Sequence, residues 1–126
     1  MNAPATAAKY SWSAVPLEQL NPTLSRRVVT GKEMMIAHVY LKAGSIVPKH
    51  HHVNEQTGML IRGSLTFRIG DETAELRPGS TWVIPADVPH SVDAGPDGAF
   101  LIELFAPPRD DWAGLDRLEP SPPSRF

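Results

Sequence analysis

The stretch GSIVPKHHHVNEQTGMLIRG, residues 44–63, places three of the chain's five histidines in a row within a frame of glycines. On an extended strand alternate side chains share a face, and residues two apart lie ~6.6 Å from each other. His50 and His52 therefore point to one side and His51 to the other. Two imidazoles on one face can converge on a single ion, so the run is either a metal site or a set of exposed surface histidines.

The same alternation suggests which residue joins the two histidines. Continued from His52 through Asn54, it reaches Gln56 and leaves Glu55 on the opposite side with His51. A bend or bulge after His52 would reverse this assignment. The phase of the strand therefore favours the amide, with the carboxylate as the alternative ligand.

Outward from this run, the chain is made of short apolar or alternating stretches separated by turn residues. These stretches are MMIAHVYL (34–41), GMLIRG (58–63), LTFRI (65–69), AELRP (74–78), TWVIP (81–85), HSVDA (90–94) and AFLIELF (99–105). No long stretch repeats every 3.6 residues, so the pattern predicts an antiparallel all-β sandwich or barrel with little helix. IGDE (69–72) predicts a two-residue hairpin turn and AGPDGA (94–99) a longer turn. The one candidate helix is residues 109–118.

The composition excludes several classes of function. A chain of 126 residues fits one compact domain. Its formal net charge of -2 and pI near 6.2 leave no basic stripe for nucleic acid. Without cysteine, any metal site must use nitrogen and oxygen ligands. The N-terminus lacks a secretory pattern, and no run of about 18 apolar residues occurs, so we expect no membrane partner and a cytoplasmic location.

Two glycine-framed motifs carry a resemblance to a known family. Residues 44–63 read G-x5-H-x-H-x3-Q-x6-G, which resembles the first motif of the cupin superfamily, with Gln where many cupins have Glu. After a spacer of 15 residues, residues 79–94 are similar to the second motif, G-x5-P-x-G-x2-H-x3-N. Asp87 stands where glycine is usual in that motif, and Ala94 stands where asparagine is usual.

The resemblance implies a fold and a ligand set. The fold is a single-domain cupin β-barrel, also called a double-stranded β-helix or jelly roll, and the two motifs meet inside it. The implied metal ligands are His50, His52, Gln56 and His90. Nitrogen and oxygen donors suit one divalent transition metal per chain, which is Mn, Fe, Co, Ni or Zn, and the sequence does not select among them.

A closer resemblance rests on three further stretches. SRRVVTG (25–31), MMIAHVYLKAGSIVPKHHHVNEQ (34–56) and FAPPRDDW (105–112) look like the KdgF-type cupins. That family linearises the unsaturated monouronates released from pectin and alginate. The similarity covers roughly residues 17–113, which is most of the chain.

In the KdgF-type family an aspartate on the last strand, a phenylalanine two residues on and an arginine four further on line the site. The matching residues here are Glu103, Phe105 and Arg109, with Glu in place of Asp. The resemblance implies that Glu103 shuttles a proton and that Phe105 supplies an apolar wall of the substrate site. Arg109 would act with Glu103 in catalysis and bind the substrate carboxylate.

Strand alternation bears on other polar residues. In residues 101–105 it places Glu103 on the face of its leucine and phenylalanine neighbours, so this carboxylate is either solvent-facing or inside the barrel. His38 is more often a packed or edge residue than a cavity residue in such a pattern. Arg26 and Arg27 point to opposite faces, so at most one reaches the pocket.

The ends of the chain differ in composition from the middle. We expect an N-terminal extension over residues 1–16, the cupin barrel domain over residues 17–113 and a proline-rich tail over residues 114–126. The tail is typical of a frayed end, and the alternative is a polyproline II ligand.

These features favour a metal-dependent cupin enzyme acting on a small oxygenated substrate, and specifically the ring opening of 4,5-unsaturated monouronates, which are carboxylate-bearing sugars. One alternative is a cupin dioxygenase that uses Fe, Ni or Mn. Another is a barrel that binds a metal and a small molecule without catalysis. The resemblance also implies a homodimer formed through strands near the N-terminus.

Overall fold

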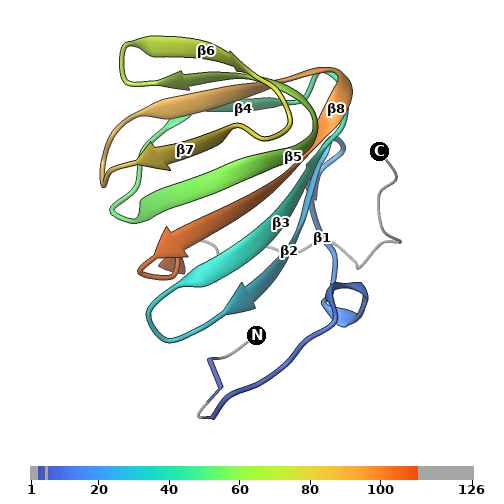
Figure 1. Cartoon of the computed structure of the whole chain (residues 1–126), viewed down its shortest axis with the longest axis vertical. Coiled ribbons are helices and arrows are strands. Elements are labelled where there is room, and N and C mark those ends of the chain that lie inside the picture. The colour runs from blue at the N-terminus through green and yellow to red at the C-terminus, as the bar shows by residue number, and fades with distance from the viewer. Residues whose placement is uncertain (1–2, 5, 111–126) are drawn as a thin grey trace.

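The structure is a computed structural model that describes residues 3–4 and 6–110 (Figure 1). It confirms the predicted all-β barrel with little helix. In the described residues one antiparallel sheet of eight strands follows the 3₁₀ helix η1 (Trp12–Ala14). The strands are β1 (Glu18–Asn21), β2 (Leu24–Thr30), β3 (Met35–Leu41), β4 (Ile46–His50), β5 (Glu55–Ile69), β6 (Glu72–Leu76), β7 (Thr81–Ile84) and β8 (His90–Ala106).

Two long strands, β5 and β8, pair with each other along their whole length and belong to both layers of the barrel. The first half of β5 pairs with β7, and the second half of β8 pairs with β3, from which the sheet extends through β2 to β1. The second half of β5 pairs with β6, and the first half of β8 pairs with β4. Both β5 and β8 bend midway, and Figure 1 shows β4 and β6 on one side of this bend and β1, β2 and β3 on the other. This arrangement is a jelly roll.

The turn predicted at residues 94–99 is wrong, because β8 runs through it without a break. Gly63 pairs with Ala99 and Leu65 pairs with Ala94, so Ser64 alone faces residues 95–98. A β-carbon on Gly63 would lie 1.9 Å from a backbone carbonyl oxygen of β8. The glycines and proline here therefore encode a bulged bend that carries both strands from one layer to the other.

The turns beside these strands follow the sequence more closely. The predicted hairpin at residues 69–72 is confirmed, with Ile69 paired to Glu72 and Gly70 at a φ of 57°. The turn before β8 also forms, with the unusual Asp87 at a φ of 62°. Its backbone N–H donates to the carbonyl oxygen of His52 at 2.8 Å, which ties this turn to the histidine run.

The core lies between the two layers and consists of inward-facing side chains. Its larger cluster is Leu41, Leu60, Leu65, Phe67, Trp82, Ile84, Val92, Ala94, Ala99 and Leu101, and a smaller one is Met35, Ala37 and Phe105. Each large apolar side chain so buried contributes about 1.5–3 kcal/mol to stability. The core therefore fixes the strands whose ends carry the polar residues described below.

A segment before β1 packs against the outer face of β2 and β3. The Trp12 ring stacks on His38 with centroids 3.5 Å apart, and Arg27 donates a hydrogen bond to the carbonyl oxygen of Val15. His38 is thus an outer-face packing residue, the more frequent of its two expected positions.

The predicted domain limits are not tested by these contacts and stay predictions. The tail over residues 114–126 lies outside the described residues, as does nearly all of the helix predicted for residues 109–118. Among the described helices, none is long and apolar enough to cross a membrane.

Candidate metal centre

Three histidines meet at one end of the barrel. His50 ends β4 and pairs with His90, the first residue of β8, while His52 follows in the loop. One ring nitrogen from each histidine lies within 4.8 Å of those of the other two. The single extended strand predicted through the run is wrong, because β4 ends at His50. The expected convergence of His50 and His52 is nevertheless present, and His51 is exposed.

Hydrogen bonds orient all three imidazoles in the same way. The Nδ1 atoms of His50, His52 and His90 lie 2.8, 3.0 and 2.9 Å from backbone carbonyl oxygens. A carbonyl only accepts, so each Nδ1–H donates and each Nε2 keeps its lone pair for a ligand. The Nε2 of His90 is buried and has no hydrogen-bond partner within the described residues. A buried acceptor in that state fits a metal ion.

Burial favours the neutral form of two of these rings. It lowers the pKa of His90 to about 4 against the opposing hydrogen bond to Val88, and Arg109 adds to the lowering. Burial, with Arg109 as the next cause, also lowers the pKa of His52. Neutral imidazole is the form that binds a metal, so His90 and His52 have the protonation state that such an ion needs.

The structure turns Gln56 inward and Glu55 outward, as the strand phase favoured. Gln56 is buried and its Oε1 lies 3.0 Å from the Nε2 of His52, whereas Glu55 is exposed. With Nδ1 of His52 donating to a carbonyl, its Nε2 and this amide oxygen are two acceptors facing each other. A cation between them satisfies both, so the donor set of three imidazoles and one amide oxygen fits a divalent metal ion.

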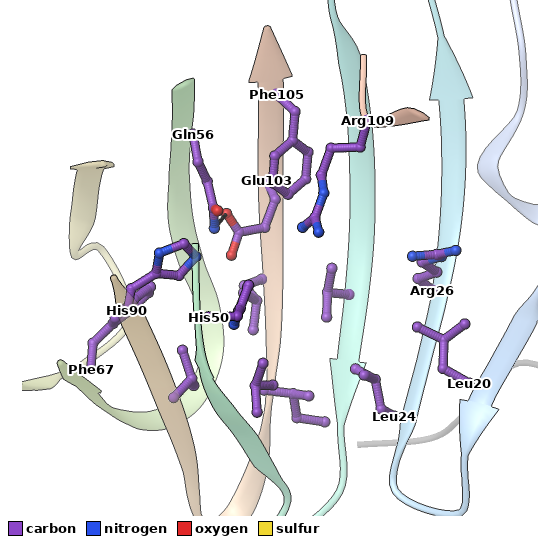
Figure 2. A pocket seen from close by; sticks show the side chains of 15 residues that line it. Leu20, Leu24, Arg26, His50, Gln56, Phe67, His90, Glu103, Phe105 and Arg109 are labelled. Carbon is purple, nitrogen blue, oxygen red and sulfur yellow. Dashed lines mark hydrogen bonds between the residues drawn. The ribbon is translucent and has the colours of Figure 1, made fainter. Parts of the chain in front are cut away.

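The cavity beside the histidines has a polar end and an apolar wall (Figure 2). His50, His90, Gln56, Glu103 and Arg109 line the polar end. The apolar wall includes Leu20, Leu24, Val39, Leu41, Val47 and Leu101. The cavity volume is about 90 Å³, so it suits a small molecule rather than a polymer.

Glu103 lies inside the barrel, which decides between its two expected positions. It is 5% exposed and shares the inner face of β8 with Leu101 and Phe105. Its Oε2 accepts hydrogen bonds from Gln56 Nε2 at 2.6 Å and from Trp82 Nε1 at 3.2 Å. Burial raises the pKa of this carboxyl to about 8, although both hydrogen bonds and Arg109 oppose the rise. Burial therefore favours the protonated form of Glu103 in the metal-free protein.

The structure brings the other two predicted residues to the same cavity. Phe105 is buried, and its ring lies edge-on to His52 with centroids 5.7 Å apart. The guanidinium carbon of Arg109 lies 5.2 Å from the centre of the Phe105 ring. Figure 2 shows Gln56, Glu103 and Arg109 pointing toward the space beside the histidines.

Three contacts at the site were not predicted. Asn54, expected on the face of Gln56, instead donates from Nδ2 to the carbonyl oxygens of Pro107 and Pro108 at 2.6 and 3.2 Å. It fastens the segment before Arg109 to the histidine loop. Trp82 reaches Glu103 from β7, and only its apolar alternation within TWVIP signalled an inward position.

Arg26 is the third such contact. It is buried, lines the cavity and pairs with Glu18 at 3.2 Å. Arg27 points outward, so only one of the two arginines reaches the cavity, within the limit that alternation set. The sequence did not indicate which of the two faces inward.

A jelly roll with histidines from two of its strands and a loop at one end is the architecture of a cupin. The family described as "Cupin domain" matches residues 37–102, more than half of the chain, and the chain belongs to this family. Within this family, the chain is similar to KdgF proteins. It is 27% identical over 99 residues to the pectin degradation protein KdgF of Dickeya dadantii (strain 3937), a match that covers 77% of this chain and 90% of that protein.

Solved structures agree on the fold. The structure of KdgF from Halomonas sp. superposes with a TM-score of 0.80 at 24% identity, covering 85% of this chain and 99% of that one. An RmlC-like cupin from Shewanella frigidimarina NCIMB 400 superposes with a TM-score of 0.78 at 22% identity, covering 84% and 96%. The chain is thus a small cupin with a histidine cluster compatible with a single transition-metal ion.

Proposed function

We propose that this protein is a metal-dependent enzyme that opens the ring of 4,5-unsaturated monouronates. The observation that carries the proposal is the position of Glu103. Its side chain lines the same cavity as His50 and His90, and its carboxyl group is hydrogen-bonded to Gln56. The pectin-degradation relative supports a uronate as the substrate, because such sugar acids are the building blocks of pectin.

His50, His52, His90 and Gln56 would hold the metal ion. All four donors are neutral, so the ion keeps its full charge apart from any bound anion or water. When bound, the ion supplies Lewis-acid polarisation of a substrate oxygen. The donor set suits Mn, Fe, Co, Ni or Zn.

The proposed reaction moves one proton within the substrate and needs no oxidant. The anomeric hydroxyl loses its proton, C1=O forms and the bond from C1 to the ring oxygen breaks. The enolate so formed becomes a ketone at C5 when C4 takes up a proton. Glu103, protonated and facing the cavity, gives the proton to C4 and regains one from the anomeric hydroxyl.

The other cavity residues orient the substrate. Arg109 has a planar guanidinium that can form paired, charge-assisted hydrogen bonds with the uronate carboxylate. Phe105 supplies an apolar wall that limits the positions of the sugar ring beside Glu103. With Glu103 neutral, Arg109 and the metal ion give this end of the cavity a net positive charge, which favours an anionic ligand.

An absorbance assay tests the proposal directly. Metal-loaded protein incubated with 4,5-unsaturated galacturonate or mannuronate should remove the enol-ether absorbance faster than buffer does. An oxygen electrode in the same reaction should record no oxygen uptake, because ring opening is an isomerisation. Oxygen uptake would favour the dioxygenase alternative, and no acceleration with any of the five metals would contradict this substrate. A cytoplasmic location and a homodimer stay predictions.

A further inference from the structure

Trp82, Gly58 and Glu103 form one row across three strands. In the strand register Gly58 of β5 pairs with Trp82 of β7 on one side and with Glu103 of β8 on the other. A β-carbon on Gly58 would lie 2.7 Å from three atoms of the Trp82 indole ring. The missing side chain therefore lets the indole cross the central strand and reach the carboxyl group.

The indole is fixed in this position by packing. Trp82 is 5% exposed, and its ring lies against Phe67 with centroids 5.1 Å apart. Phe67 itself lines the cavity. An indole held between a glycine and a phenylalanine has little freedom to turn, so its N–H is aimed at Glu103 before any substrate enters.

Both hydrogen bonds to the carboxyl group of Glu103 end on the same oxygen. Gln56 donates to Oε2 at 2.6 Å and Trp82 donates to Oε2 at 3.2 Å. Within the described residues the structure gives Oε1 no hydrogen bond, while the side chain of Glu103 lines the cavity. The two oxygens of this one carboxyl group are therefore in different environments.

That difference decides where a proton sits. An N–H donor needs an acceptor lone pair, and in a neutral carboxyl group the carbonyl oxygen is the better acceptor. Two N–H donors on Oε2 therefore leave Oε1 as the oxygen that carries or takes up a proton. We propose that Trp82 is a positioning residue that, with Gln56, holds the carboxyl group of Glu103 so that proton transfer takes place at Oε1, the oxygen that faces the cavity.

This inference rests on the proposed function, in which Glu103 transfers a proton, but one of its tests does not. Trp82→Phe keeps an aromatic ring and removes the N–H, and Gly58→Ala keeps the N–H but displaces the ring. Trp12→Phe is the matched control, because Trp12 stacks on the outer face of the barrel. The infrared bands of the Glu103 carboxyl group, a C=O band in the protonated form or carboxylate bands in the ionised form, are those that disappear in Glu103→Gln.

We expect the Glu103 band to shift in Trp82→Phe and in Gly58→Ala, with a C=O band moving to higher frequency, because Oε2 loses a donor, and to stay in place in Trp12→Phe. We also expect kcat for the uronate to fall about threefold to tenfold in both cavity variants, the value of one hydrogen bond. KM should change less than about twofold and metal content not at all, because neither the ligands nor Arg109 is altered.

Each result separates the two proposals. An unshifted band in both cavity variants overturns the role of Trp82, whether or not the protein acts on uronates. A band that shifts in a protein without uronate activity contradicts the proposed function alone. If Gly58→Ala does not fold, the band in Trp82→Phe decides.

Discussion

The side-chain amide of Gln56 joins the candidate metal centre to Glu103. Its Oε1 lies 3.0 Å from the Nε2 of His52, and its Nε2 donates to Glu103 Oε2 across 2.6 Å. An amide carries an acceptor and a donor on one rigid plane, so it can serve a metal ion and a carboxyl group together. A carboxylate at this position, as in many cupins, has no such donor.

Gln56→Glu should therefore separate metal binding from turnover. The new carboxylate remains an oxygen ligand, so we expect metal content to stay at that of the unmodified protein. Turnover of the uronate should fall by at least about tenfold, because Glu103 loses a short hydrogen bond. Elemental analysis and initial rates measure the two effects. Turnover equal to that of the unmodified protein would show that the amide donor has no role.

The histidine run offers a matched pair of variants. His50→Ala combined with His52→Ala removes two converging donors, and we expect the purified protein to lose its metal. His51→Ala removes a neighbouring ring whose side chain is 64% exposed and lies 3.8 Å from Asp87, so metal content should not change. Metal retained in the double variant would contradict the site.

Arg109 should affect substrate binding more than the chemical step. Arg109→Ala removes a charge-assisted hydrogen bond worth about 1.5–3 kcal/mol, which corresponds to a rise in KM of about 10-fold to 100-fold. Arg109→Lys keeps the charge but loses the paired geometry, so its KM should lie between that of the unmodified protein and that of Arg109→Ala. Steady-state kinetics at fixed metal content give these values. An unchanged KM in Arg109→Ala would exclude a contact with the substrate carboxylate.

Glu103 should make stability depend on pH in the metal-free protein. Its pKa is raised from 4.5 to about 8, so between these values the folded state binds more protons than the unfolded state. The contribution of this group to the free energy of unfolding therefore falls as pH rises through that range. Glu103→Gln lacks the titrating group, so the free energy of unfolding of the unmodified protein, minus that of Glu103→Gln, should fall with increasing pH. Urea unfolding with a chelator present measures both free energies. A difference that does not change with pH would contradict the raised pKa of Glu103.

Local sequence patterns were sufficient to predict much of the fold and part of the candidate site. Strand alternation was enough to group Glu103 with Leu101 and Phe105 and to favour Gln56 over Glu55, although it left open whether Glu103 faces solvent or the inside of the barrel. It succeeded because a period of two depends on neighbouring residues alone. The convergence with His90 needed the family resemblance, since nothing local connects residues 40 positions apart.

What the sequence missed depends on pairing between distant strands. The glycines of residues 94–99 look like a turn until the register shows Ser64 opposite the bulge. Gly58 has no special local pattern, and its role appears only when Trp82 and Glu103 are found on either side of it. Which of Arg26 and Arg27 faces inward likewise followed from the register of β2, which the alternation of the pair left open.

The most direct test of the central claim is a metal titration of the chelator-treated protein, followed through the loss of enol-ether absorbance of a 4,5-unsaturated monouronate. We predict that the rate rises until about one metal ion is bound per chain and then levels off, as expected for a single site. The variant with His50 and His52 both replaced by alanine should stay at the rate in buffer. A rate that is the same with and without metal, or that survives the loss of both histidines, would contradict a metal-dependent ring-opening enzyme.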